Sequence, residues 1–162
     1  MNLKFCIASL CLSAMLVTGC SKDSTSVLST KMSATVDGVA WSATVPLAVK
    51  SSYGFVITGT QASLAGSTST LVITLKGTTT GTYTLIATTN NCVATYTPSI
   101  LAASDSYASL TSGTVNLTEI NTTDKTITGT FSFPSCSNTA LKSVAITNGK
   151  FTDLKYTDAS TK

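Results

Sequence analysis

Apolar and polar residues alternate along most of the chain after residue 30. Single residues separate Phe55 from Ile57, and Leu71 from Ile73 and Leu75. No long window repeats apolar residues every three or four positions, as an amphipathic helix would require. A period of two, with threonine, valine and isoleucine frequent throughout, predicts β-strands that each have one buried face and one wetter face.

Turn-forming residues divide this pattern into short strands. Asp37 and Gly38 predict a hairpin, and Asn121 to Asp124 predict a four-residue turn. Asn148 and Gly149 either turn a last hairpin or bulge one long strand. The expected strands are residues 32–36, 39–45, 55–60, 71–76, 82–87, 92–97, 113–120, 125–133, 141–147 and 150–156.

Three segments depart from a simple run of strands. Pro46 is expected to close the strand before it or to mark it as an edge strand. Residues 98–109 are expected to form a loop or a short helical turn. Residues 134–140 are expected to form a polar loop that carries Cys136.

About nine or ten short strands with regular turn signals indicate an all-β fold. We expect an antiparallel β-sandwich, with a lipocalin-like β-barrel as the alternative. A parallel α/β architecture would need crossover helices, which the pattern lacks.

The first 19 residues have the layout of a secretory signal peptide. Lys4 precedes an apolar run from Phe5 to Val17, which at about 13 residues is shorter than the roughly 20 residues of a membrane-spanning helix. The residues before Cys20 resemble a bacterial lipobox, which implies that Cys20 becomes a lipidated N-terminus. Its acyl chains would anchor the chain to a membrane.

These features predict three regions of the chain and its location in the cell. We expect a signal peptide over residues 1–19, a lipidated cysteine and flexible tether over residues 20–30, and a single all-β domain over residues 31–162. Ser21 lacks the acidic character of an inner-membrane retention signal. An outer-membrane lipoprotein, either periplasmic or exposed at the cell surface, is therefore expected.

The cysteines and the charged residues limit which partners and which kinds of site we expect. Cys92 and Cys136 remain after the signal peptide and Cys20 are set aside, and an oxidising compartment favours a disulfide between them over two buried thiols. The chain has no arginine, which argues against nucleic acid as a partner. With no histidine and no paired CxxC motifs, no metal site and no cofactor are expected.

Catalytic residues are scarce. The absence of histidine excludes Ser–His–Asp and Cys–His arrangements. Glu119 and Asp124 flank one expected turn and are the pair that a carboxylate-dependent glycan hydrolase would use. Acids beside a turn are usually solvated surface groups, so we expect a protein that is not an enzyme.

The aromatic residues are the remaining candidates for ligand binding. Aromatic faces stack on sugars, and Trp41 and Tyr107 are the candidates that we single out. Tyr107 lies in the irregular segment and is expected to be the most exposed tyrosine. Trp41 is expected to pack in the core rather than to bind a ligand, because a domain with so few large side chains needs most of them for packing.

Two stretches at the ends of the expected domain carry a family resemblance. They are VDGVAW, from Val36 to Trp41, and GTFSF, from Gly129 to Phe133, followed by ITNGKF, from Ile146 to Phe151. The SGTV stretch that ends at Val115 fits between them. The chain thus resembles a family of small lipoproteins of unknown function that is common in Bacteroidetes. The shared motifs are turn glycines and core aromatics, so the resemblance implies a fold and no activity.

Taken together, the residues favour a lipid-anchored protein of the cell envelope. We expect a binding or adhesion module that recognises a glycan or a protein partner. A β-barrel carrier of a small apolar ligand and the carboxylate-dependent hydrolase are the alternatives.

Overall fold

A computed structural model describes residues 31–62, 68–86, 92–99, 106–110, 112–137 and 142–159, with the backbone alone at residues 134–137. The signal peptide, Cys20 and the tether lie outside these residues and stay predictions. The strands are β1 Met32–Val36, β2 Val39–Ser42, β3 Val45–Lys50, β4 Gly54–Ala62, β5 Thr68–Lys76, β6 Gly81–Thr84, β7 Val93–Thr97, β8 Tyr107–Ala108, β9 Thr114–Asn121, β10 Thr126–Ser137 and β11 Ser143–Asp158.

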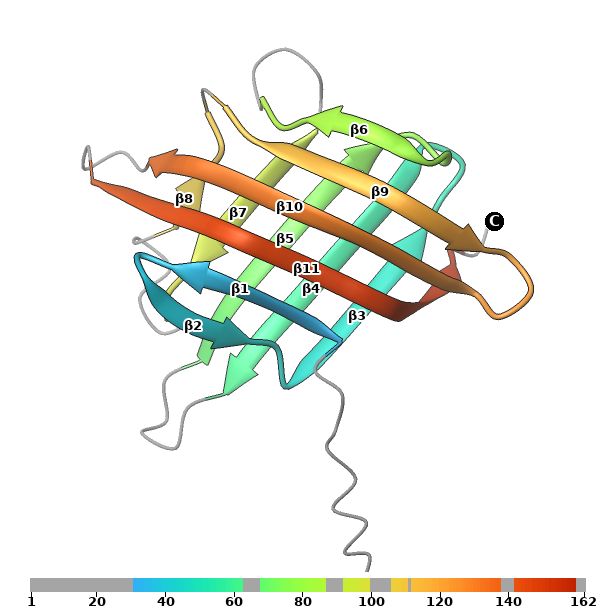
Figure 1. The fold of residues 1–162 in the computed structure, drawn as a ribbon, viewed down its shortest axis with the longest axis horizontal. Coiled ribbons are helices and arrows are strands. Elements are labelled where there is room, and N and C mark those ends of the chain that lie inside the picture. The colour runs from blue at the N-terminus through green and yellow to red at the C-terminus, as the bar shows by residue number, and fades with distance from the viewer. Residues whose placement is uncertain are drawn as a thin grey trace, which may run out of the picture.

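One curled sheet forms two layers that cross each other (Figure 1). The front layer contains β2, β1, β11, β10, β9 and β6, and the back layer contains β3, β4, β5 and β7. The end of β11 pairs with β3, and the short β8 pairs with both β7 and β10. These two connections join the layers on opposite sides of the core.

The all-β prediction is confirmed, with eleven strands in the described part of the chain. Its pairs are antiparallel except β11 with β3, which is parallel. The expected strand 39–45 is wrong: the chain leaves β2 after Ser42 and begins β3 at Val45. Pro46 lies in β3 before the residues that pair with β11, where a missing N–H breaks no ladder hydrogen bond, as an edge position requires.

The end of the chain forms one long strand rather than two. Asn148 has a φ of 51° and the register between β10 and β11 shifts beside Phe131, so Asn148 and Gly149 bulge β11 instead of turning a hairpin. The polar loop expected at residues 134–140 is also wrong in part. Strand β10 continues to Ser137, which places the backbone of Cys136 opposite Val144.

The core lies between the layers and is built from the inward positions of the alternation. Phe131 stacks between Phe133 and Phe151, with ring centroids 5.9 and 6.3 Å apart. Alternation along β9 and β10 places five residues on the inward face, and all five are buried: Val115, Leu117, Ile127, Phe131 and Phe133. Within the described residues, no helix is long and apolar enough to cross a membrane.

Two hydrogen bonds from Asp37, one of the side chain and one of the backbone, attach the β1–β2 hairpin to β11. Asp37 adopts a left-handed φ of 46°, and Gly38 follows with a φ of 81°. The Asp37 carboxylate accepts a hydrogen bond of 2.7 Å from the Ala145 N–H, and the Asp37 N–H donates to the Ala145 carbonyl at 2.9 Å. The predicted hairpin is therefore confirmed, and it is also tied to the start of β11.

Candidate functional site

A hollow of about 320 Å³ lies where the β1–β2 hairpin faces the ends of β4, β7 and β8. This volume is at the lower end of the range for small-molecule sites. We call it the interlayer pocket. Its walls are Val36, Asp37, Val39, Ala40, Trp41, Gln61, Tyr96, Pro98, Tyr107 and Val144.

Trp41 forms one wall and is held rigidly by the back layer. Its side chain is 2% exposed, and its Nε1–H donates a 2.8 Å hydrogen bond to Ser69 Oγ on β5. A Cβ at Gly59 would lie 2.7 Å from Trp41 Cη2, so β4 accepts the indole only because position 59 has no side chain. Trp41 thus connects β2 to β4 and β5, which confirms its expected packing role.

A polar chain runs behind the Trp41 ring. Ser69 is buried, and its hydroxyl donates a 3.4 Å hydrogen bond to Gln61 Oε1. Burial raises the pKa of the Tyr96 hydroxyl above its ordinary value of 10.0, the Ser69 hydrogen bond opposes that shift, and Asp37 and Tyr107 add to it. Tyr96 is therefore a neutral phenol near pH 7.

Tyr107 forms the opposite wall and corrects one expectation. We expected it to be the most exposed tyrosine, but it is 8% exposed, whereas Tyr53 is 79% exposed. The reason is β8: Tyr107 pairs with Tyr96 of β7, and this register turns both rings toward the space between the layers. The two aromatic residues singled out from the sequence, Trp41 and Tyr107, nevertheless line the same pocket.

Sequence reasoning did not single out three residues of this pocket. Tyr96 belongs to the general group of aromatic candidates, and it is buried on the inward face of β7 with Ala94. Gln61 continues the inward series of β4, where an amide in an apolar alternation is the signal that could have found it. The contribution of Asp37 depends on the long-range docking of its hairpin, and no local pattern reveals this.

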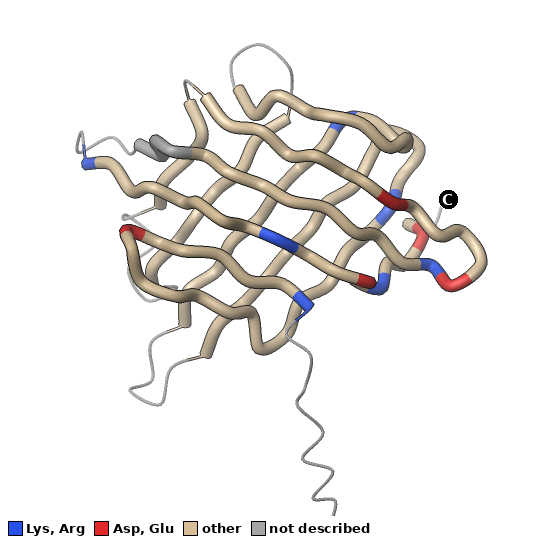
Figure 2. Tube along the Cα trace, in the orientation of Figure 1, with Lys and Arg blue, Asp and Glu red and all other residues tan. Residues whose placement is uncertain are grey.

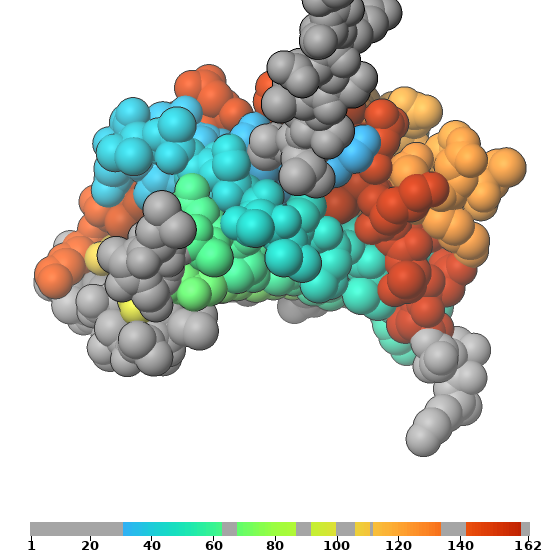
Figure 3. All heavy atoms as spheres, turned by 90° about the horizontal axis from the view of Figure 1, so that it is seen from below, coloured from blue at the N-terminus to red at the C-terminus, as the bar shows by residue number. Residues whose placement is uncertain are grey.

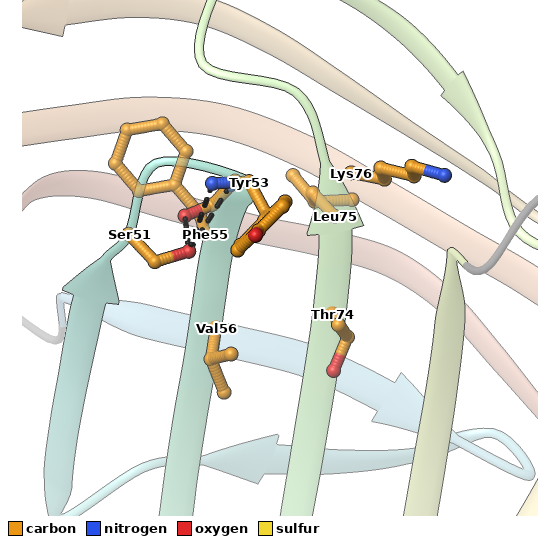
Figure 4. Close-up of a pocket in the computed structure, with 8 residues that line it drawn as sticks. Ser51, Tyr53, Phe55, Val56, Thr74, Leu75 and Lys76 are labelled. Atoms are coloured by element: carbon orange, nitrogen blue, oxygen red, sulfur yellow. Dashed lines mark hydrogen bonds between the residues drawn. The ribbon is translucent and has the colours of Figure 1, made fainter. Parts of the chain in front are cut away.

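A second hollow, of about 260 Å³, lies on the outer surface beside the β3–β4 hairpin (Figure 4). Ser51 Oγ accepts hydrogen bonds from the N–H groups of Tyr53 and Gly54. A Cβ at Gly54 would lie 1.8 Å from the Leu75 carbonyl oxygen. This tightly seated turn holds the exposed Tyr53 ring near Val56 at the edge of the back layer.

The two carboxylates of the hydrolase alternative lie on β9 and in the turn that follows it. Glu119 lies on β9, opposite Thr128, and Asp124 lies in the β9–β10 turn. Asp124 accepts a 2.9 Å hydrogen bond from Asn121 Nδ2 and so belongs to the turn itself. Across the described ranges, no group of three or more acidic, cysteine or histidine residues is placed to hold a metal ion.

The predicted disulfide is not shown. Cys92 is a buried free thiol, and its sulfur accepts a 3.1 Å hydrogen bond from the Lys76 N–H. The side chain of Cys136 lies outside the described part of the structure, so its pairing with Cys92 stays a prediction.

Comparison with known proteins gives a family and no function. A family model described as a domain of unknown function, DUF6252, matches residues 29–155. No curated protein and no solved structure matches the chain. The matched range contains the whole interlayer pocket.

Proposed function

The chain belongs to the DUF6252 family, and from that premise we propose that it is a lipid-anchored cell-envelope protein whose β domain binds a small glycan end in the interlayer pocket. The observation that carries the proposal is the convergence of Trp41, Tyr96 and Tyr107 on one hollow between the layers. These residues are only 2–8% exposed, so packing holds their rings in place and the hollow between them is already formed, as small-molecule sites usually are.

The chemistry of the walls favours a sugar ring among small ligands. A sugar has C–H faces that pack against aromatic rings and hydroxyls that need hydrogen-bond partners. Asp37 Oδ2 and the Gln61 amide N–H₂ make no hydrogen bond within the described residues, and neither does the Tyr107 hydroxyl. These groups are available to sugar hydroxyls, and no lysine lines the hollow to attract a strongly anionic ligand.

Trp41 offers a direct test because it is the only tryptophan in the chain. We expect a neutral oligosaccharide from a defined panel to change the Trp41 fluorescence of the full chain, purified in detergent, in a saturable way. Tyr107→Phe removes only a hydroxyl and should weaken this binding about 5- to 100-fold, the usual range for leaving a buried polar partner unpaired.

Tyr53→Phe is the matched control. It also removes one tyrosine hydroxyl, but from the outer surface and far from the pocket lining, so the affinity should not change. The proposal fails if no neutral sugar in the panel changes the emission, or if Tyr107→Phe binds as tightly as the parent chain.

A small apolar ligand is the second candidate, because Val36, Val39, Pro98 and Val144 also line the pocket. A fluorescent apolar probe would then bind, and Tyr107→Phe would leave its affinity unchanged or increase it. The effect of Tyr107→Phe on the two kinds of ligand therefore separates a carrier of apolar molecules from a sugar-binding site.

The proposal assigns no catalysis to Glu119 and Asp124. We expect Glu119→Gln and Asp124→Asn to leave glycan binding unchanged. If the parent chain hydrolyses a polysaccharide and either substitution abolishes the hydrolysis, the chain is an enzyme and the proposal is wrong.

A further inference from the structure

The interlayer pocket has a single charged group among its described lining residues, the carboxylate of Asp37. Asp37 Oδ1 accepts the 2.7 Å hydrogen bond from the Ala145 N–H, whereas Oδ2 has no hydrogen-bond partner in the described part of the chain. The side chain is exposed at the turn of the β1–β2 hairpin. One oxygen thus fixes the carboxylate in place, and the other is left for a donor in the pocket.

The negative charge of Asp37 acts on the back layer across the pocket. Burial is the main reason why the pKa of the Tyr96 hydroxyl is raised, and the Ser69 hydrogen bond opposes that shift. The Asp37 charge raises this pKa further, as does Tyr107. A field that disfavours a tyrosinate anion at this point favours a cation there. Figure 2 shows the turn of the β1–β2 hairpin in red at one end of the molecule, with several lysines toward the other end.

Near the other end of β11, the chain itself holds ammonium groups with the same two kinds of partner. Lys125 Nζ forms an ion pair with Asp158 and lies 5.8 Å from the centroid of the Tyr156 ring. Lys50 Nζ lies at the same distance from that ring. The interlayer pocket also brings a carboxylate together with aromatic rings, but no lysine is among the described residues that line it. The position of the cation is therefore open to a ligand.

We propose that the sugar bound in the interlayer pocket carries an ammonium group, as an amino sugar with a free amine does. This inference rests on the proposed function and adds the charge of the ligand to it. The ammonium would donate to Asp37 Oδ2 and lie beside the aromatic rings, so that both attractions act on one cation. Figure 3 shows β1 and β2 stacked over β3 and β4, and this stacking holds Asp37 opposite the back layer.

The charge of Asp37 also determines which sugars the pocket should bind less tightly. N-acetylation of the amine removes its positive charge, and an acidic group on the sugar would face Asp37 with a like charge. A hydroxyl at the same position can still donate to Oδ2, but it gains no attraction between unlike charges. We therefore expect the amine to bind most tightly, the hydroxyl next, and the acetamide or the acid least.

Sugars that differ in one substituent test the proposal, with the Trp41 emission of the full chain as the readout. Methyl glycosides of glucose, galactose and mannose are compared with their counterparts that carry an amine or an acetamide on the second ring carbon. The measurements are made at about pH 6, where such an amine is protonated. We expect at least one amino sugar to bind about three- to tenfold more tightly than its hydroxyl counterpart, a modest factor because water weakens the attraction to an exposed carboxylate. Raising NaCl from about 0.05 M to about 0.5 M should reduce this preference, because salt screens exposed charges.

Asp37→Asn removes the charge with little change of shape. Asparagine keeps an oxygen that can accept the Ala145 N–H, and it tolerates the left-handed φ of 46° at this position. The variant should lose the preference, so that the amine and the hydroxyl sugars bind equally. Asp153→Asn is the matched control, because Asp153 is also exposed, has a φ of 44° and does not line the pocket. It should keep the preference of the parent chain.

The ammonium inference and the proposed function fail in different ways. If hydroxyl sugars bind and no amino sugar binds more tightly, or if Asp37→Asn keeps the preference, the ammonium inference is wrong and glycan binding stands. If no sugar changes the Trp41 emission, both are wrong. Should Asp37→Asn not fold, the salt dependence tests the same charge in the parent chain, and a preference that salt leaves unchanged overturns the inference.

Discussion

At the scale of single residues, the motifs at the two ends of the domain have structural reasons. Asp37 binds the Ala145 N–H, Trp41 fills the space over Gly59, and Asn148 takes the left-handed conformation of the bulge in β11. Gly149 follows Asn148 and faces the ring of Phe131. These positions therefore serve a turn, a docking contact or a close approach.

Gly149→Ala tests the closest of these approaches. A Cβ at this position would lie 2.3 Å from Phe131 Cδ2 and Cε2, so the stacked phenylalanines would have to move. We expect the free energy of unfolding to fall by about 1–3 kcal/mol, the usual cost of overpacking a core.

The measurement is urea unfolding followed by circular dichroism, with Gly38→Asn as the control. Gly38 has open space around it and a φ of 81°, and asparagine tolerates this conformation. A Gly149→Ala variant as stable as the Gly38→Asn variant would show that the Phe131 ring can shift freely.

At the scale of strands, alternation predicted which residues face the core, because burial on one face of a sheet imposes a period of two. The inward series of β4 and β5 follow that rule, and the series of β9 follows it as far as Leu117, after which the register with β10 shifts. Alternation did not predict the ends of strands or the position of Tyr107, because a two-residue strand such as β8 has no period to detect. Its direction is set by pairing with β7 and β10.

The same limit applies to the interlayer pocket. Trp41 and Tyr107 were found from their residue type alone, while Gln61 and Asp37 enter the site through contacts between strands that are distant in the sequence. The choice between bulge and hairpin at Asn148 was also left open by the sequence, since both use a left-handed residue followed by glycine. Long-range pairing of β11 with β10 and β1 decides it.

Ser69→Ala tests the bond between β2 and β5. The substitution leaves the buried Trp41 Nε1–H without its acceptor, and we expect the free energy of unfolding to fall by about 1–3 kcal/mol. Trp41 emission should change as well, because the polarity around the indole changes. Thr70→Ala, on the opposite face of the same strand, is the control and should cost less; equal losses would mean that the Trp41 bond contributes nothing specific.

At the scale of the whole molecule, Tyr96 makes the free energy of unfolding decrease at alkaline pH. Burial raises the folded pKa of Tyr96 above its ordinary value of 10.0, so its contribution is complete below pH 10 and decreases as the pH rises through the folded pKa. The pKa of Lys125 is also raised, mainly by its hydrogen bond to Asp158, which acts in the same direction.

We therefore expect the urea midpoint of the Tyr96→Phe variant to fall less steeply with rising pH, above pH 10, than the midpoint of the parent chain. Urea midpoints measured at pH 8, 10 and 11 give the slope, and Tyr53→Phe is the exposed control. A slope unchanged by Tyr96→Phe would assign the alkaline loss to other groups.

The pairing of Cys92 with Cys136 is a further prediction for the whole molecule. A bridge would stabilise the domain by about 3–4 kcal/mol on the chain-entropy account. Mass spectrometry of the unreduced protein after alkylation in denaturant checks it, because unfolding exposes the buried Cys92: two unmodified cysteines support the bridge, and alkylation of both excludes it.

Strand β11 pairs with β1, β3 and β10 and follows all three of them in the sequence. A chain that emerges from a ribosome or a membrane pore N-terminus first has β1 and β3 available long before their partner. The front layer cannot be completed, and β3 cannot pair with it, until residues 143–158 have emerged. A chain cut short before Ser143 would leave β1, β3 and β10 each without its β11 partner, and such unpaired edges are open to pairing with other chains.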